Sequence, residues 1–456
     1  MRQSINPATG EVLRTYPELS DREIEEALER ASREAPAWGA LSCAERAGPM
    51  RAAAALLRKE KAVLARTITE EMGKPITEAE AEIDKSAWNC EYVAENAERW
   101  LTDEIVETDA SLSYVSYLPL GTVLTILPWN FPVWQVFRAV VSSLMAGNTV
   151  LLKHAPNVPG CAELVTDLMR RAGFPAGVFQ NFPAPVEHIA RVIADPRVAA
   201  VTLTGSPAAG AAVAAQAGAA CKKSVLELGG SDAFIVLDDA DVEAAAKAAV
   251  RARFANCGQV CLASKRFIVT PGIAEEFEER MLAETRKLRV GDPLDRATQL
   301  GPMARADLRE ALHRQVQQSI AAGAKLLLGG QPRPGRGFYY EPTVLTQVAA
   351  PMPVATEETF GPVAAIMRAR DADDAVRLAN DSRYGLSCCL WTRDVERARG
   401  LARRIATGGV FINGVSASDP RMPVGGVKLS GYGRELARAG ILELVNQQSV
   451  WIGPRR

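Results

Sequence analysis

The sequence predicts an α/β fold made of two blocks, in each of which short apolar strands alternate with helices. Short apolar runs followed by longer helical patterns are typical of parallel sheets with helices on both faces. The chain has 456 residues, of which 48% are hydrophobic and 23% are charged. That length and composition are ordinary for a globular protein whose two or three domains each bury a sizeable core.

Residues 20–100 are expected to be helical. Ser20 followed by Asp21 offers an N-cap in front of an apolar-periodic stretch, and the run 52–64 consists of strong helix formers. Residues 111–117 then alternate between polar and apolar side chains, which predicts an exposed strand.

The two blocks of alternating segments follow from residue 122. In the first block, strands are expected at 122–127, 149–153, 178–182, 199–204 and 224–228, and helices at 133–144, 160–172 and 207–216. In the second, strands are expected at 233–237, 265–270, 361–369, 386–392 and 408–413, and helices at 241–253, 273–288, 371–380 and 394–405. A terminal strand is expected at 448–452.

Charge and cysteine content narrow the classes of function. Lys plus Arg number 53 against 54 Asp plus Glu, so no nucleic-acid partner is expected. Long apolar stretches are interrupted by proline, glycine or charge, and the N-terminus has no apolar signal segment, so neither a membrane span nor secretion is expected. Eight cysteines without framework spacing indicate the reducing cytoplasm. Three histidines, with no second cysteine pair beside Cys257 and Cys261, argue against a metal site.

Three residues on separate loops predict covalent acyl chemistry. Cys261 offers a thiol that attacks a carbonyl carbon, and Glu227 a carboxylate that activates the water releasing the acyl group. Asn130 offers a side-chain amide that donates to the oxyanion formed by the attack. Each residue taken alone is more often structural, since an isolated cysteine is usually a small buried hydrophobe.

A strand-to-helix turn and a strand-end lysine predict a phosphate site. Gly205 and Ser206 follow an apolar strand and open a helix, whose free N–H groups favour an anion. The pattern is not GxGxxG, so a plain turn is the alternative. Lys153 ends another strand, where its cation reaches either a ribose or phosphate oxygen or solvent.

Five runs stand in the order found in the NAD(P)-dependent aldehyde dehydrogenase superfamily, which the chain resembles from residues 5–10 (INPATG) to its end. The runs are 128–132 (PWNFP), 227–230 (ELGG), 258–261 (GQVC), 357–362 (EETFGP) and 425–431 (GGVKLSG). Within the family, the runs 151–157 and 227–232 most resemble bacterial succinate-semialdehyde dehydrogenases.

The resemblance implies an aldehyde dehydrogenase-like α/β fold with three parts. These are a Rossmann-like cofactor domain (1–110 and 122–229), an α/β catalytic domain (230–430) and a β-strand oligomerisation arm (111–121 and 446–456). A homodimer or homotetramer is expected.

Carried over by position, the resemblance makes Cys261 the nucleophile and Glu227 the general base. The Asn130 side chain and the Cys261 backbone N–H would form the oxyanion hole. The cofactor site would be lined by Trp129, Lys153, Pro156, Gly205, Ser206, Leu228, Glu358 and Phe360, with Glu358 on the nicotinamide-side ribose. NAD-preferring relatives often present a carboxylate three residues after the lysine that matches Lys153, where it repels a 2′-phosphate. In this chain that position is Pro156, and His154 is adjacent to Lys153, so no repelling charge is present. We therefore expect NADP, with NAD as the alternative.

The same resemblance suggests a substrate that carries a carboxylate, for which a pocket arginine is suited. Arg138 lies six residues after Pro132 and on roughly the same helical face as Trp134, and Ser418 resembles the pocket serine of relatives. An ordinary surface cation is the alternative for Arg138.

Two departures from the family weaken the substrate assignment. Ala255 replaces a second pocket arginine found in some relatives, and Val424 replaces a phenylalanine. Arg421 is a candidate to compensate. Cys257, four residues before Cys261, prompts the hypothesis of a reversible disulfide between them.

The sequence thus predicts oxidation of succinate semialdehyde to succinate with NAD(P)+ through a cysteine thiohemiacetal and thioester. One alternative is another short aliphatic or aromatic aldehyde. A CoA-acylating enzyme would not need Glu227 as a hydrolytic base. A non-catalytic scaffold should have lost at least one of Cys261, Glu227 and Asn130, and none is lost.

Overall fold

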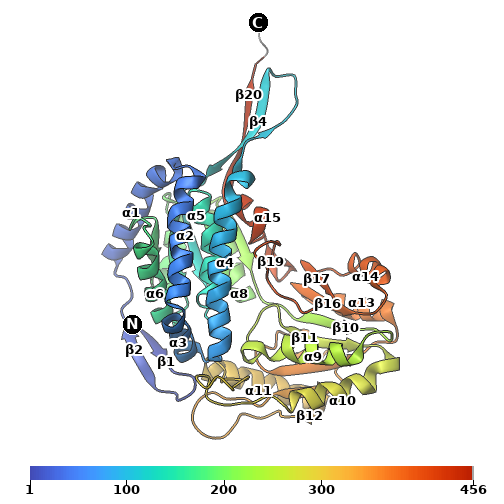
Figure 1. Ribbon diagram of the computed structural model, residues 1–456. Coiled ribbons are helices and arrows are strands. Elements are labelled where there is room, and N and C mark those ends of the chain that lie inside the picture. Colours follow the sequence, from blue (N-terminus) through green and yellow to red (C-terminus); the bar gives the residue numbers. More distant parts are fainter. Residues whose placement is uncertain (454–456) are drawn as a thin grey trace.

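Two open, mainly parallel sheets organise the structure, a computed structural model that describes residues 1–453 (Figure 1). The first sheet has the strand order β19 (Gly431–Tyr432), β9 (Lys223–Glu227), β8 (Val198–Thr204), β5 (Thr122–Leu127), β6 (Thr149–His154) and β7 (Phe179–Asn181). Its strands are parallel from β9 to β7, and β19 is antiparallel to β9. The predicted first block is confirmed, and β19 joins it from much later in the chain.

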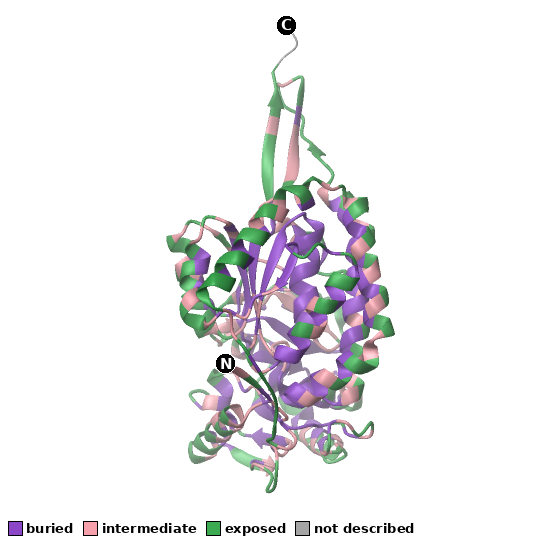
Figure 2. Ribbon diagram, turned by 90° about the vertical axis from the view of Figure 1, so that its left-hand side faces the viewer, coloured by how far each residue is buried: buried purple, intermediate pink, exposed green. Residues whose placement is uncertain are grey.

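Helices cover both faces of the six-stranded sheet, as expected for strands that are apolar on both sides. One face packs against α5 (Trp134–Met145) and α6 (Pro159–Arg171), which are overlaid by α2 (Cys43–Lys59), α3 (Lys61–Met72) and α4 (Ile76–Leu101). The other face packs against α1 (Asp21–Ala40), α7 (Ile189–Ala194) and α8 (Pro207–Ala219). In Figure 2 the strands are buried between helices whose outer faces are exposed.

Local capping explains where the first two helices begin. Ser20 at α1 and Ser42 at α2 each form a capping box with the glutamate three residues later, Glu23 and Glu45. The predicted N-cap at Ser20 is confirmed. The continuous helix expected over 52–64 is wrong, because the chain breaks at Glu60 between α2 and α3.

The second sheet has the strand order β12 (Lys325–Leu328), β13 (Thr343–Thr346), β14 (Val363–Arg368), β11 (Ser264–Val269), β10 (Asp232–Val236), β16 (Ser387–Trp391) and β17 (Gly409–Ile412). Only the β12–β13 pair of this described sheet is antiparallel. The helices of this part are α9 (Val242–Phe254), α10 (Ala274–Thr285), α11 (Ala306–Ala321), α12 (Pro353–Thr356), α13 (Ala372–Asn380) and α14 (Val395–Ala402).

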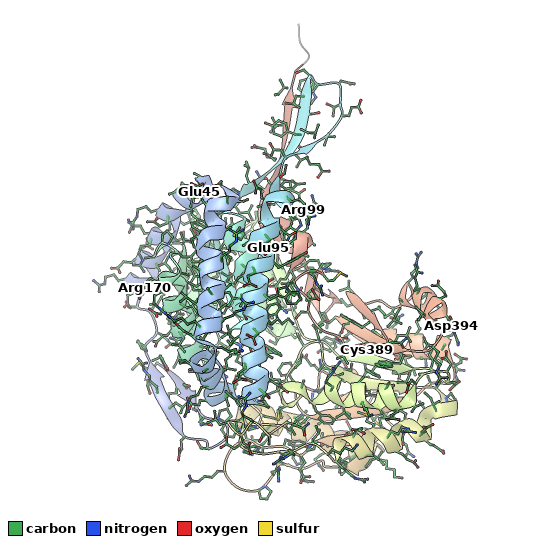
Figure 3. All side chains as sticks on the ribbon, viewed as in Figure 1. Glu45, Glu95, Arg99, Arg170, Cys389 and Asp394 are labelled. Atoms are coloured by element: carbon green, nitrogen blue, oxygen red, sulfur yellow. The ribbon has the colours of Figure 1, made fainter. Side chains whose placement is uncertain are left out.

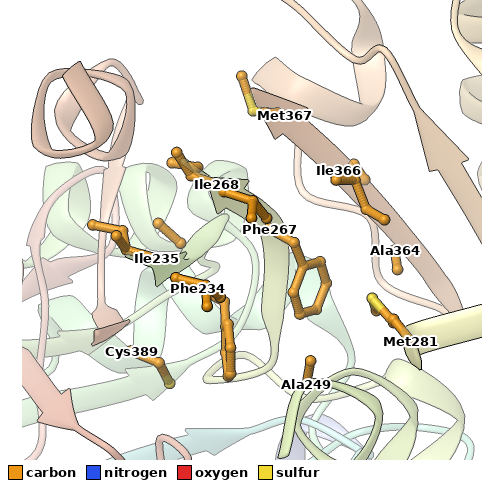
Figure 4. Close-up of a cluster of buried hydrophobic side chains, with 14 of the residues drawn as sticks. Phe234, Ile235, Ala249, Phe267, Ile268, Met281, Ala364, Ile366, Met367 and Cys389 are labelled. Atoms are coloured by element: carbon orange, nitrogen blue, oxygen red, sulfur yellow. The ribbon is translucent and has the colours of Figure 1, made fainter. Parts of the chain in front are cut away.

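Aromatic and aliphatic side chains fill the core of the second sheet (Figure 4). The Phe234 and Phe267 rings have centroids 5.4 Å apart, and Phe234 stacks on Trp391 at 5.9 Å. By contrast, charged residues such as Glu45, Arg99, Arg170 and Asp394 lie on the outer helices and their ends (Figure 3).

An arm projects from the first sheet's side of the molecule (Figure 1). It consists of β4 (Leu112–Pro119), paired antiparallel with β20 (Val445–Ile452) along its length, and β3 (Glu104–Ile105). The helix α15 (Ala437–Leu442) leads into β20. The expected arm segment 111–121 contains β4, and the segment 446–456 contains all of β20 except Val445, although 454–456 lie outside the described residues. The short strand β3 was not predicted. The domain boundaries stay a prediction.

Smaller elements complete the structure. A hairpin of β1 (Arg2–Ile5) and β2 (Val12–Tyr16) opens the chain, and β15 (Tyr384–Gly385) pairs with β18 (Val427–Lys428). Within residues 1–453, every helix is too short or too polar to cross a membrane.

Candidate active site

The carboxyl ends of neighbouring parallel strands meet at one edge of the six-stranded sheet. The loop after β5 carries Trp129 and Asn130, the loop after β8 carries Gly205 and Ser206, and β9 ends at Glu227. Parallel strands end side by side, so these residues gather at the edge where open α/β sheets bind ligands.

The seven-stranded sheet supplies the facing wall from the amino ends of its strands. Cys261 precedes β11, Gly230 precedes β10 and Glu358 precedes β14. The Gly230 N–H donates to Glu358 Oε1 at 2.9 Å. A Cβ on Gly229 would lie 2.2 Å from Glu358 Oε2, so glycine at position 229 lets the Glu358 carboxylate approach the main chain, and a side chain there would displace it.

A cavity of about 240 Å³ lies where these two edges meet. Its wall contains the three expected catalytic residues, Cys261, Glu227 and Asn130. It also contains most of the expected cofactor residues: Trp129, Gly205, Ser206, Leu228, Glu358 and Phe360. The rings of Trp129 and Phe360 meet edge to face with centroids 5.7 Å apart.

The side-chain amide of Asn130 is fixed beside the cysteine loop. Its Nδ2 donates to the Gln259 backbone carbonyl at 3.0 Å, and the backbone carbonyl of Asn130 accepts from Asn256 Nδ2 at 2.8 Å. Asn130 is buried. A donor held in place before substrate arrives is what stabilisation of an oxyanion requires.

A buried lysine holds the main chain at Cys261. Lys265 Nζ donates to the carbonyl oxygens of Val260 at 3.0 Å and Cys261 at 2.6 Å. Burial raises the pKa of the Cys261 thiol, and the cations Arg138 and Lys265 oppose that rise. These two cations therefore favour the thiolate, which is the nucleophilic form.

Glu227 is a carboxyl group whose proton affinity is increased by its surroundings. It is 3% exposed, and burial together with the nearby Glu435 carboxylate raises its pKa to about 8, against the opposing charges of Arg138 and Arg434. The deprotonated form, which acts as the base, becomes the major form as the pH rises through that value.

A second cavity, of about 330 Å³, also has Cys261 in its wall. Arg138 and Ser418, the expected substrate residues, both line it. Arg138 is buried, its Nε forms an ion pair with Glu435, and its Nη2 donates to Thr204 Oγ1 at 3.2 Å. The pair with Glu435 is close but poorly aligned as a hydrogen bond.

The chain matches the aldehyde dehydrogenase family over residues 1–450. It belongs to that family. It is 51% identical to succinate semialdehyde dehydrogenase [NAD(P)+] Sad of Escherichia coli (strain K12), over 98% of this chain and 97% of the relative. It is 46% identical to succinate-semialdehyde dehydrogenase [NADP(+)] of Mycobacterium avium (strain 104), over 99% and 96%.

A solved structure agrees with the fold of this aldehyde dehydrogenase. The succinic semialdehyde dehydrogenase of Streptococcus pyogenes, in complex with NADP+, superposes with a TM-score of 0.97 at 36% identity, covering 99% of this chain and 100% of that one. The aldehyde dehydrogenase-like fold class expected from the sequence is confirmed.

Two expected cofactor residues of the aldehyde dehydrogenase lie at the same sheet edge but beyond the wall of the 240 Å³ cavity. Lys153 is half-buried at the end of β6, and Pro156 is exposed in the loop that follows. Between them, His154 is buried and shares a hydrogen bond with the Pro132 carbonyl at 2.7 Å. Burial lowers the pKa of His154 to about 4, so the ring is uncharged at neutral pH, and both of its nitrogens are engaged by the main chain, at the Pro132 carbonyl and the Ala155 N–H.

The disulfide hypothesis for Cys257 is not supported by this aldehyde dehydrogenase structure. Cys257 is 1% exposed and packs in the core of the second sheet, whereas Cys261 lines both cavities.

Asn256 and Cys257, in the turn before the cysteine loop, have φ angles of 51° and 55°, a left-handed conformation that costs on the order of 1–3 kcal/mol for such residues. The turn into the cysteine loop is thus held by its surroundings.

The structure does not bring Arg421, suggested as a compensating residue, into the wall of the substrate cavity. Arg421 points to the surface, pairs with Asp419 at 2.7 Å and does not line the 330 Å³ cavity. A lysine that sequence reasoning missed does line it: Lys85 Nζ donates to Ser418 Oγ at 2.7 Å and lies 4.4 Å from the centroid of the Trp134 ring.

Three other functional candidates of the aldehyde dehydrogenase also escaped sequence reasoning: Lys265, Glu435 and Glu78. Glu78 lines the second cavity, accepts from the Asn256 N–H at 2.8 Å, and has a pKa raised to about 7 by burial. The available signal was the recurrence of polar residues at helical spacing in α4, where Glu78, Glu82 and Lys85 share one face.

Proposed function

We propose that this aldehyde dehydrogenase oxidises succinate semialdehyde to succinate with NADP+. The observation that carries the proposal is that Cys261 lines two cavities, one with the residues of a dinucleotide site and one with basic side chains. Relatives at 46% to 51% identity are named for this substrate.

Cys261 begins the reaction by adding its thiolate to the aldehyde carbon. Asn130 Nδ2 and the Cys261 backbone N–H stabilise the alkoxide of the resulting thiohemiacetal. Loss of hydride converts this intermediate to a thioester. Lys265 holds the main chain at the thiol, so that the sulfur and the oxyanion donors keep their relative positions.

Glu227 completes the reaction as the general base. It takes a proton from water, which attacks the thioester and releases succinate while the Cys261 thiol is regenerated. The burial that raises the pKa of Glu227 makes it a stronger base than an exposed carboxylate.

The residues present fit a dinucleotide. The Ser206 side chain caps α8, whose N-terminus opens at the cavity edge, and the flat side chains Trp129 and Phe360 stand in the cavity wall. Lys153 would face the adenosine ribose, where Pro156 brings no repelling carboxylate. A nicotinamide held by these residues would supply the acceptor for the hydride. These features favour NADP, with NAD as the alternative.

The arm supports assembly into a homodimer or homotetramer. Large apolar side chains on it are exposed, with Trp451 at 58% and Ile452 at 47% exposure. The eight cysteines, none of them in a disulfide within residues 1–453, support work in the reducing cytoplasm.

Steady-state kinetics test the proposal. We expect kcat/KM with NADP+ to be at least about 100-fold higher for succinate semialdehyde than for butanal, the neutral aldehyde of equal chain length. NADP+ should give a higher kcat/KM than NAD+. Equal values for the two aldehydes would contradict the substrate assignment.

A further inference from the structure

Lys85 is placed to meet the far end of a substrate held at Cys261. It comes from α4, is half-buried, and lines the same 330 Å³ cavity as the catalytic thiol. Its ammonium lies over the Trp134 ring and donates to Ser418 Oγ. The Trp134 ring and the Ser418 hydroxyl orient the Lys85 side chain, but neither group carries a negative charge that would neutralise the ammonium.

The carboxylates nearest to Lys85 are engaged elsewhere. Glu82 forms a buried ion pair with Lys74, and its Oε1 accepts from the N–H groups of Val133 at 2.8 Å and Trp134 at 2.9 Å. Asp419 pairs with Arg421. Within residues 1–453 Lys85 therefore has no ion-pair partner, although two carboxylates contribute to its field.

Arg138, the other cation of the cavity, is in the opposite situation. Its guanidinium pairs with the buried carboxylate of Glu435 and donates to Thr204. A substrate carboxylate at Arg138 would have to share a charge already compensated by Glu435. A substrate carboxylate at Lys85 would supply the missing counter-charge, which is the more favourable event in a poorly solvated cavity.

We propose that Lys85, assisted by Ser418, binds the distal carboxylate of the substrate and sets the preference for a short ω-carboxy aldehyde over a neutral aldehyde. This inference rests on the proposed function and adds the specificity-determining residue to it. Arg138 then acts chiefly by pairing with Glu435 near Glu227 and by favouring the Cys261 thiolate.

The test compares two aldehydes in three variants. Lys85→Met should lower kcat/KM for succinate semialdehyde by about 100-fold, mainly through KM, because the half-buried charge partner of the carboxylate is lost. For butanal, kcat/KM should stay within about 3-fold, since no charge is bound there. Lys85→Arg, which keeps the charge, should restore most of the preference. The matched control Lys61→Met removes an exposed lysine of α3, paired with Asp84 at 3.0 Å, and should change neither value.

The outcomes separate the inference from the proposed function. A wild-type enzyme that does not prefer succinate semialdehyde would overturn both. If the wild-type enzyme prefers succinate semialdehyde and Lys85→Met keeps that preference, only the role of Lys85 is overturned. The same holds if Lys85→Met lowers kcat/KM equally for both aldehydes. If Lys85→Met does not fold, Ser418→Ala decides: a selective loss of about 10-fold for succinate semialdehyde supports the site, and an unchanged ratio overturns it.

Discussion

At the scale of single residues, the pKa values of Lys85 and Glu227 are shifted from opposite sides to about the same value, 8. Burial and the charge of Arg138 lower the pKa of Lys85 to about 8, against the opposing fields of Asp419, Glu82 and Cys261. Burial and Glu435 raise the pKa of Glu227 to about 8. The first group loses its charge and the second gains one over the same range, so activity alone does not separate them.

The ratio of kcat/KM for succinate semialdehyde to that for butanal isolates Lys85. The titrations of Cys261 and Glu227 affect kcat/KM for both aldehydes equally, so they cancel in the ratio. Lys85 is cationic below its pKa of about 8. We therefore expect the ratio to be high at about pH 6.5 to 7, where nearly all of Lys85 is protonated, and to fall as the pH passes about 8. In Lys85→Arg the ratio should stay flat over this range, and a wild-type ratio independent of pH would contradict the assignment.

Sequence reasoning found the residues that stand in short loop motifs and missed those placed by packing. Cys261, Glu227 and Asn130 follow or precede strands, so their loops could be recognised without knowing the fold. Lys85 lies in the middle of a long helix with charged neighbours, where a solvated face was the simpler interpretation. Only the packing of α4 against α5 turns it toward the cavity.

At the scale of elements, α4 positions α5 through one carboxylate. Glu82 accepts from the first N–H groups of α5 and pairs with Lys74 beneath the Phe131 ring. A negative charge at a helix N-terminus is favourable because it meets free N–H donors and the positive end of the helix dipole. The start of α5 in turn follows the loop of Asn130.

Glu82→Gln should destabilise the protein by about 3–5 kcal/mol, because it leaves the buried Lys74 charge unpaired. Glu80→Gln is a matched control on the same helix, since Glu80 pairs with Arg296 at the surface, and should cost about 0–1 kcal/mol. The midpoints of guanidinium unfolding, followed by tryptophan fluorescence, give the comparison. Similar midpoints for both variants would show that Glu82 has no such role.

Elements were predictable where apolar periodicity is strong and were missed where it is weak. The predicted strands of both blocks appear where expected, and most of them are largely buried; the edge strand β17 is only partly buried. The helix α11 was missed because it buries only Leu312, Val316 and Ser319, and β12 was missed because it is a partly exposed edge strand. At the break, Glu60 pairs with Arg171 of α6 at 2.5 Å, a tertiary contact that no local pattern encodes.

At the scale of the whole molecule, the site is formed by both sheets, and the arm exposes apolar side chains that the proposed assembly would cover. The carboxyl edge of one sheet faces the amino edge of the other, so the thiol and its base come from different parts of the chain. The arm carries exposed apolar residues away from both lobes (Figure 2), which is unfavourable unless another surface covers them.

Charge on the arm should therefore weaken assembly. The double variant Trp451→Asp and Ile452→Asp should shift the mass measured by analytical ultracentrifugation to a smaller species at micromolar concentration, because two aspartates would be desolvated in the interface. Val186→Asp, at an apolar residue 76% exposed outside the arm, is the control and should leave the mass unchanged. An unaltered mass for the double variant would exclude the arm as the interface.

The most direct test of the account is to trap the acyl group on Cys261. In Glu227→Gln the hydrolytic base is absent while the thiol and the oxyanion donors are retained. Mixed with succinate semialdehyde and NADP+, this variant should release one burst of NADPH and yield a peptide in which Cys261 carries a succinyl thioester. A peptide with unmodified Cys261 after such a burst, or a succinyl group on another residue, would contradict the account.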